Sequence, residues 1–170
     1  MTRFNRIALS VVAACLLAGV SGFGHGNEKG KAQARVGNAT VIIDYASPAL
    51  KGRDVLKLIQ PGQVWRLGAD VPTTIESSAD LDFGGVRVPK GKHVLLALMN
   101  EPGNWSLIVS SKPAAQYEPS DKIAEVPLEL SEAGDSVEEM AIGLTNHGGR
   151  GVIDVAWGTH RLSASFTEAK

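Results

Sequence analysis

Apolar residues along most of the chain occur in short runs, and Gly, Pro, Asn and Asp separate one run from the next. Within many runs a large apolar side chain recurs at every second position, as it does in residues 105–109, 126–130 and 140–144. A period of two is typical of half-buried β-strands, and short runs bounded by turn-forming residues favour an all-β fold. The pattern predicts roughly nine strands between residue 36 and the C-terminus.

Antiparallel strands with one apolar face pack as two sheets or close into a barrel. We therefore expect an antiparallel β-sandwich, or a partly open barrel, formed as a single domain by residues 36–170. Residues 54–60, which precede the turn-forming pair Pro61-Gly62, predict one short helix. Pro127 interrupts an alternating run and has no backbone N–H, which favours an edge position for its strand.

The N-terminus departs from this alternation. Arg3 and Arg6 precede an almost uninterrupted apolar stretch over residues 7–20, and small residues follow. This order is typical of a secretory signal peptide, which we assign to residues 1–24. The stretch is shorter than the about 20 residues that a spanning helix needs, so we expect no transmembrane helix in the mature chain and a location in the periplasm or outside the cell. The polar residues 25–35 lack apolar periodicity and predict a flexible leader.

Cys15 leaves an alternative open for the N-terminus. Residues 12–15 (VAAC) resemble the lipidation box of bacterial lipoproteins, in which the cysteine becomes the first mature residue and carries the lipid. Leu16 and Leu17 would then follow the anchor directly, whereas tethered chains usually begin with a polar spacer. The soluble exported form is therefore preferred.

Charge and composition exclude several classes of partner and cofactor. Lys and Arg total 17 against 18 for Asp and Glu, so we expect no broad basic surface for nucleic acid. The single cysteine excludes a disulfide framework, a four-thiolate zinc site and an iron–sulfur cluster within one chain. The four histidines have no HxH or HExxH spacing, and we expect neither a metal nor another cofactor.

Two blocks of sequence carry a family resemblance. They are residues 45–53 (YASPALKGR) and residues 61–70 (PGQVWRLGAD), and Thr73-Thr74 follow the second block. With these blocks the chain resembles an uncharacterised bacterial secreted family, domain-of-unknown-function family 2911, over nearly all of its mature length. The resemblance implies a location and a fold, because the family has no established activity to transfer.

The same two blocks contain the candidate binding residues. Lys51, Arg53 and Arg66 would form an anion site if the fold brings them into one cleft, because guanidinium groups bind carboxylate or phosphate through paired hydrogen bonds. The predicted set is Tyr45, Lys51, Arg53, Trp65, Arg66, Asp70, Thr73 and Thr74. In the alternative interpretation, Arg66 pairs with Asp70 or Asp44. Lys51 and Arg53 then face water, and Trp65 packs in the core.

These features favour a binding protein over an enzyme. The sequence contains no GxSxG motif and no other recognisable nucleophile with a positioned base. We expect an exported binding or accessory module for a small anionic or envelope-derived ligand. A hydrolase of undefined substrate, which uses Asp70, Tyr45 or His93 beside the cations, is the alternative.

Overall fold

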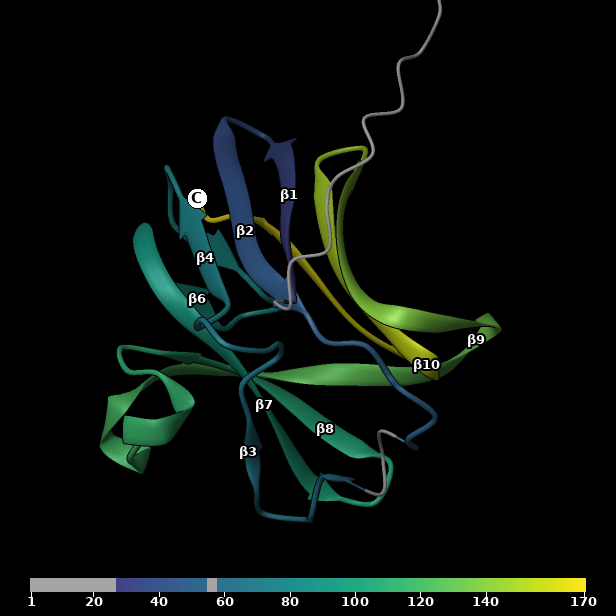
Figure 1. The fold of residues 1–170 in the computed structure, drawn as a ribbon. Helices are drawn as coiled ribbons and strands as arrows, with labels where there is room; N and C mark the ends of the chain where they lie inside the picture. The colour runs from purple at the N-terminus through teal and green to yellow at the C-terminus, as the bar shows by residue number, and fades with distance from the viewer. Residues whose placement is uncertain (1–26, 55–57) are drawn as a thin grey trace, which may run out of the picture.

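The computed structural model describes residues 27–54 and 58–170, and these residues form an antiparallel all-β protein (Figure 1). Two short 3-10 turns, η2 (Ala114–Gln116) and η3 (Pro119–Asp121), lie between the eighth and ninth strands. The strands are β1 (Glu28–Val36), β2 (Ala39–Ser47), β3 (Val64–Trp65), β4 (Thr74–Ser77), β5 (Leu81–Asp82), β6 (Arg87–Val88), β7 (Gly91–Glu101), β8 (Asn104–Ser110), β9 (Lys122–His147) and β10 (Arg150–Glu168). The predicted all-β, antiparallel class is confirmed.

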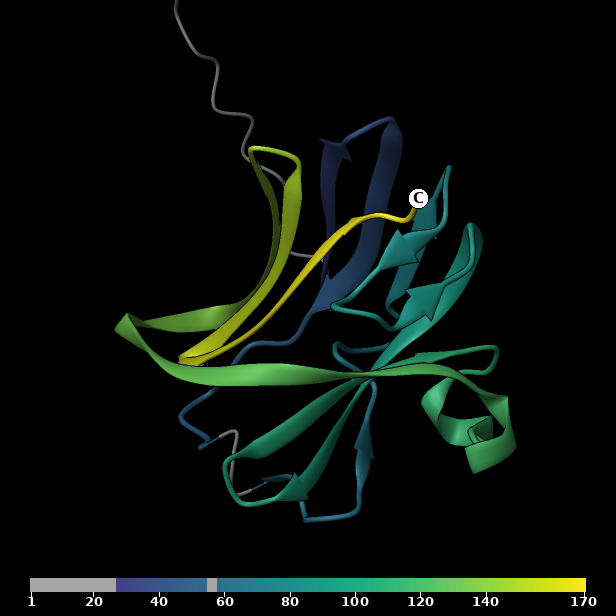
Figure 2. The same ribbon diagram turned by 180° about the vertical axis from the view of Figure 1, so that it is seen from behind.

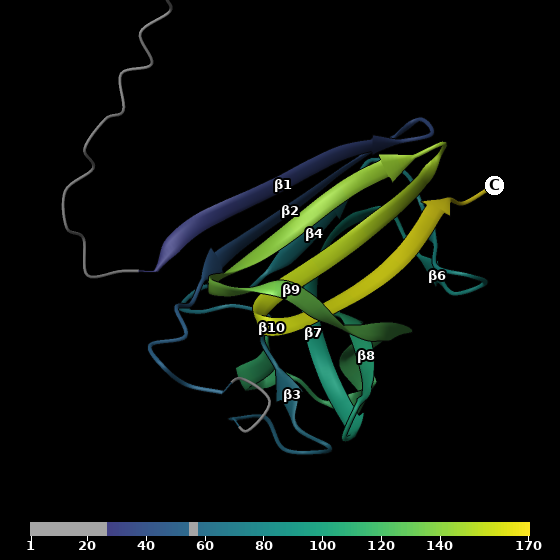
Figure 3. The same ribbon diagram turned by 90° about the vertical axis from the view of Figure 1, so that its right-hand side faces the viewer.

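All ten strands belong to one sheet that curls without closing into a barrel. Its order is β1-β2-β4-β7-β8-β9-β10-β5-β6, with β3 paired to β7. Figure 3 shows the outer half of β9 lying alongside β1. The side-chain amide of Asn146 donates to the carbonyl oxygen of Arg35 across this junction, at 2.7 Å, although β1 and β9 form no ladder. Seen from behind, β10 runs on to the C-terminus past the β5–β6 hairpin (Figure 2).

The curl depends on a corner in the long β9–β10 hairpin. From Ala156 to His160, β10 advances four residues, while the facing segment of β9 covers nine, from Glu132 to Ala141. Extra residues on one strand bend a ladder and increase its twist. Gly158 sits in the corner with φ of 61°, a conformation that glycine adopts without steric cost. Two runs that predicted separate strands, residues 126–130 and 140–144, are therefore the two arms of one bent strand.

The concave side of the curled sheet holds one hydrophobic core. β2 contributes Val41 and Ile43, while Ile42 and Asp44 between and after them are only half-buried, as the period of two requires. Phe83 and Phe166 meet inside at a centroid distance of 5.1 Å. These contacts bring together residues that are far apart in the sequence.

The predicted flexible leader is wrong for most of its length. Residues Glu28–Val36 form β1 and pair in unbroken register with all nine residues of β2, so the domain begins about eight residues before residue 36. Polar side chains, among them Lys29 and Lys31, face solvent on this edge strand, and such charges are common on strands that have no further partner. The polar composition that resembles a flexible leader belongs to an exposed edge strand of the sheet.

Several predictions concern residues outside the described part of the chain. The signal peptide at 1–24 and Cys15 lie there. The predicted helix at 54–60 includes residues 55–57, which also lie outside, and the described residues on either side of that gap form no α-helix. None of the helical turns in residues 27–54 and 58–170 is long and apolar enough to cross a membrane.

Candidate functional site

Lys51 and Arg53 lie in the loop after β2, and this loop is fastened to the β9 corner. The backbone N–H of Lys51 donates to the carboxylate of Glu138 at 3.0 Å. The Arg53 guanidinium turns back on its own loop, where its Nε donates to the carbonyl of Leu50 at 2.9 Å and its Nη2 to that of Ala49 at 3.0 Å. Two nitrogen donors of Arg53 are therefore engaged by backbone carbonyls, and these donors are not available to an anion.

Arg66 begins a strained loop between β3 and β4. Leu67 and Asp70 both adopt left-handed backbone conformations, with φ of 50° and 58°, which are uncommon for residues other than glycine. The buried hydroxyl of Thr73 donates to the carbonyl of Leu67 at 2.7 Å, and the N–H of Ala69 donates to the carbonyl of Ala46 in β2 at 3.1 Å. These contacts impose the loop conformation and fix the direction in which it presents its side chains.

Further contacts tie the same loop to the sheet. The carbonyl of Thr73 accepts from the N–H of Leu95 in β7 at 2.9 Å. A Cβ atom at Gly68 would lie 2.9 Å from the Thr73 hydroxyl, so only glycine fits there without a shift. The Asp70 carboxylate accepts from the side-chain amide of Asn27 at 2.8 Å, just before β1 begins.

The loop forms one wall of a cavity of about 120 Å³, which we call the arginine cavity. Its lining consists of Arg66, Asp70, Val71, Pro72, Val94, Leu96, Pro113, Ala114 and Ala115. Arg66 is exposed and makes neither a hydrogen bond nor an ion pair with any described residue. Asp44, a partner considered above, pairs with Lys31 at 3.5 Å, and Asp70 bonds to Asn27. The arginine cavity thus combines apolar walls with one guanidinium whose donors are available.

Trp65 faces a different cavity, of about 20 Å³, although it directly precedes Arg66. It stacks on Trp157 with a centroid distance of 5.6 Å and an interplanar angle of 12°. Trp105 and His160 join them in the lining of this space, which we call the tryptophan cavity. The indole N–H groups of Trp105 and Trp157 are buried and have no acceptor within the described residues. An unpaired buried donor costs about 1–3 kcal/mol.

The remaining predicted residues belong to the sheet framework. The ring of Tyr45 covers Gly30 on the neighbouring strand β1, where any side chain would overlap it. Thr74 lies in the ladder between Asp44 and Val94. The eight predicted residues are therefore distributed over the arginine cavity, the tryptophan cavity, the loop after β2 and the sheet. Arg66 and Asp70 are the two that share a cavity lining.

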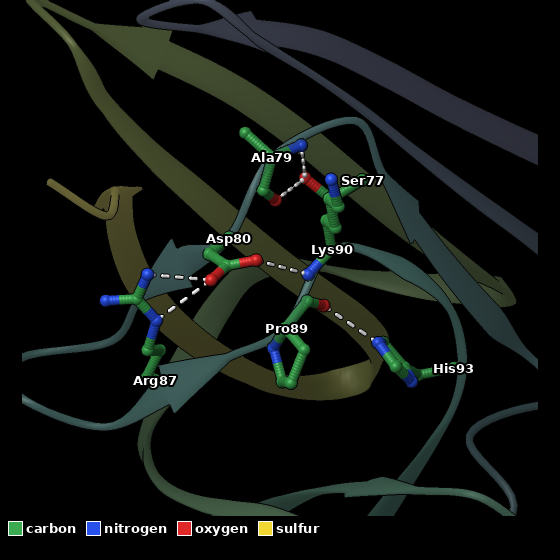
Figure 4. Close-up of polar contacts among 7 residues, drawn as sticks. All are labelled: Ser77, Ala79, Asp80, Arg87, Pro89, Lys90 and His93. Atoms are coloured by element: carbon green, nitrogen blue, oxygen red, sulfur yellow. Dashed lines mark hydrogen bonds and ion pairs between the residues drawn. The ribbon is translucent and has the colours of Figure 1, made fainter.

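His93 is held in a polar cluster at the base of the β5–β6 hairpin (Figure 4). Its Nε2 donates to the carbonyl of Pro89 at 2.8 Å. Beside it, Asp80 accepts from the N–H of Lys90 at 2.8 Å and from Nε of Arg87 at 2.9 Å. The Lys90 N–H foremost, and then Arg87, hold the pKa of the Asp80 carboxyl below its ordinary value. The cluster closes a turn, and His93 takes part in fixing the strand after it.

The contacts separate the three residues of the hydrolase alternative. Tyr45 covers Gly30, Asp70 bonds to Asn27, and His93 bonds to the backbone of Pro89. No described contact joins a base to a nucleophile among them. Residues 27–54 and 58–170 also contain no group of three or more His, Cys, Asp or Glu side chains placed to hold a metal ion.

Sequence reasoning missed a cleft of about 490 Å³ at the point where β9 and β10 diverge. The two strands pair as far as Glu129 and Ser163, after which β9 continues beside β8 and β10 turns to β5. Arg150 lines the cleft and donates from Nη1 to the hydroxyl of Ser165 at 3.3 Å. The alternating hydroxyls of residues 163, 165 and 167 are the one signal in the sequence for this polar wall. The pairing that opens it exists only in the tertiary structure.

Comparison with known protein families gives a match over most of the chain. The model of the family described as "Protein of unknown function (DUF2911)" matches residues 27–166. No curated protein and no solved structure matches the chain. The matched range begins at the residue before β1 and includes both cavities, the polar cluster and all of the cleft lining except Thr167.

Proposed function

The chain belongs to the DUF2911 family of proteins of unknown function, and we propose that it is an exported binding or accessory module for a small anionic ligand, anchored by Arg66. One observation carries the proposal. A guanidinium that is free of any described ion pair lines an apolar cavity, on a loop whose strained conformation is imposed by buried hydrogen bonds. Strain retained at a well-supported loop is a feature of binding sites.

The cavity's chemistry narrows the class of ligand. Guanidinium binds carboxylate or phosphate through two parallel hydrogen bonds. Val71, Leu96 and Ala114 offer apolar surface beside it, and Val71 is exposed although it is hydrophobic. A small organic acid with a short apolar part would use both features. The Asp70 carboxylate, already bonded to Asn27, disfavours a ligand with several negative charges.

Calorimetric titration of the mature protein with acetate, butyrate, benzoate and inorganic phosphate tests this function. We expect saturable binding of at least one monocarboxylate. Arg66→Ala should weaken it by about 1.5 to 3 kcal/mol, the scale of a hydrogen bond to a charged group. Arg35→Ala, which removes another exposed arginine with no side-chain partner among the described residues, is the matched control and should leave the affinity unchanged. Equal losses in both variants, or no binding of any probe, would overturn the proposal.

The export part of the proposal rests on the basic and apolar N-terminal residues. Mass spectrometry of the protein released by its host should find a first residue between Ser21 and Asn27. A cut in this window leaves β1, which begins at Glu28, complete. An intact Met1 would contradict export, and a lipid on Cys15 would replace the soluble form with the anchored alternative.

A further inference from the structure

The cleft where β9 and β10 diverge, which we call the β9–β10 cleft, shares no lining residue with the arginine cavity. The register of two ladders places its polar side chains on one face of the sheet. Glu129 is the cross-strand partner of Ser163, and Asp82 is the partner of Thr167. Directly opposed residues of an antiparallel pair point to the same face, and so do alternate residues of one strand. Both carboxylates therefore project on the side of the β10 hydroxyls.

This face of β10 is the outer one. Ala164 and Phe166, which alternate with the hydroxyl-bearing residues, are buried in the core, whereas Ser165 and Thr167 are exposed. Arg150 reaches the same face from the other end of β10, because its Nη1 donates to the Ser165 hydroxyl at 3.3 Å. Carboxylate, hydroxyl and guanidinium groups from β5, β9 and both ends of β10 thus meet at a surface that a solute can reach.

Much of the hydrogen-bonding capacity of this face is unused. Within residues 27–54 and 58–170, the Glu129 carboxylate and the hydroxyls of Ser163 and Thr167 have neither a hydrogen bond nor an ion pair. Arg150 has one described contact, and Asp82 accepts at one oxygen from a backbone N–H of the following turn at 2.6 Å. A carboxylate only accepts, a guanidinium only donates, and a hydroxyl does both. The β9–β10 cleft therefore offers donors and acceptors side by side.

The mixture of groups selects a neutral, polyhydroxylated ligand. An anion would face the carboxylates of Asp82 and Glu129, and a cation would face the guanidinium of Arg150. A sugar hydroxyl both donates and accepts, so it matches acceptors and donors that lie close together. The exposed ring of Pro127 and the half-buried Val152 line the same cleft and supply apolar surface for the C–H groups of a sugar ring.

We propose that the β9–β10 cleft binds a neutral disaccharide, with Asp82 and Glu129 as acceptors and Arg150 as a donor. The volume of about 490 Å³ lies in the range of about 300–1,000 Å³ that small-ligand sites occupy. Between Ser163 and Thr167, β10 rises about 13 Å, which gives room for two linked sugar rings between the two carboxylate positions. The proposal does not depend on the arginine cavity, so either site can fail its test alone.

Titration of the isotope-labelled mature protein, followed by amide NMR shifts, tests both the ligand and its place. The probes are cellobiose, lactose and N,N′-diacetylchitobiose, each compared with its constituent monosaccharides. We expect saturable binding of at least one disaccharide with a Kd below about 10 mM, weaker binding of the monosaccharides, and shifts centred on residues 126–129, 150–152 and 163–167. Saturation by none of the probes, or shifts centred elsewhere, would overturn the proposal.

Matched substitutions on β9 identify the acceptor. Glu129→Ala should weaken disaccharide binding at least about tenfold, as expected for a hydrogen bond to a charged group. Glu132→Ala makes the same change at an exposed glutamate that has no described side-chain partner and lies outside the cleft lining, and should change the affinity by less than about twofold. Equal effects of the two variants would contradict the site. If Glu129→Ala does not fold, Ser163→Ala, which removes one hydroxyl of the cleft, should weaken binding about threefold, and an unchanged affinity would count against the proposal.

Discussion

Trp65 and Arg66 are neighbours in the chain, but their side chains line different cavities. Trp65 ends β3, stacks on Trp157 and lines the tryptophan cavity. Arg66 starts the strained loop and lies exposed beside apolar walls. Adjacent residues at a strand end point to opposite faces. A compact sequence motif can therefore contain parts of two sites, one embedded in the core and one presented to solvent.

The largest effect is expected at the tryptophan cavity. Trp105→Ala removes a fully buried ring and should lower the free energy of unfolding by about 3 to 5 kcal/mol, measured by chemical denaturation. Trp65→Ala, at the half-buried ring, should cost clearly less. Equal losses would show that Trp65 is as deeply integrated in the core as Trp105, and the contrast between the two faces of β3 would disappear.

The support of the arginine loop should come next. Thr73→Val keeps the side-chain shape but leaves the buried carbonyl of Leu67 without its donor, which should cost about 1 to 3 kcal/mol. The adjacent Thr74→Val, in a half-buried ladder position, should stay within about 0.5 kcal/mol. Denaturation midpoints of the two variants provide the measurement. A silent Thr73→Val would mean that the strained turn is held by its backbone contacts alone.

A paired arginine should differ from an unpaired one in its effect on acid stability. Arg87 bonds to Asp80, whose pKa is lowered in the folded state, so this contribution is present above the pKa of unfolded Asp and is lost as the pH falls below about 4. Asp80→Asn should therefore reduce the change in melting temperature between pH 3 and pH 5. Arg87→Ala should reduce this change to a smaller extent. Substitution of Arg66 should leave this part of the curve unchanged. An identical acid profile in Arg87→Ala and the unmodified protein would contradict the part assigned to Arg87 and leave the lowered pKa of Asp80 to the Lys90 N–H.

The smallest effect on folding is expected for Arg66 itself. Arg66 makes no described ion pair, so Arg66→Ala should change the free energy of unfolding by less than about 0.5 kcal/mol. The melting temperature of the ligand-free protein provides the measurement. A loss near 3 kcal/mol would assign Arg66 to the framework and remove it as the anchor of a ligand.

The β1 strand shows what the pattern of residues leaves open. Apolar alternation predicted strands such as residues 105–110, because a buried face leaves a periodic trace in the sequence. The segment Glu28–Val36 leaves a weaker trace, because its core-facing positions hold the small residues Ala32 and Ala34 before Val36, and much of its order comes from backbone hydrogen bonds to β2. A polar edge strand and a flexible segment are therefore hard to distinguish from composition.

The sequence by itself determined the antiparallel β class, the positions of most strands and the family, because local periodicity and block motifs are properties of contiguous residues. Only the tertiary structure decided which of those residues meet. The nine-to-four mismatch at the β9–β10 corner bends the hairpin and brings Trp157 over Trp65. The Thr73 hydrogen bond to Leu67 fixes the loop that follows Arg66, and Arg66 lines the arginine cavity. Contacts of this kind depend on register and curvature across the sheet, and no short stretch of sequence encodes them.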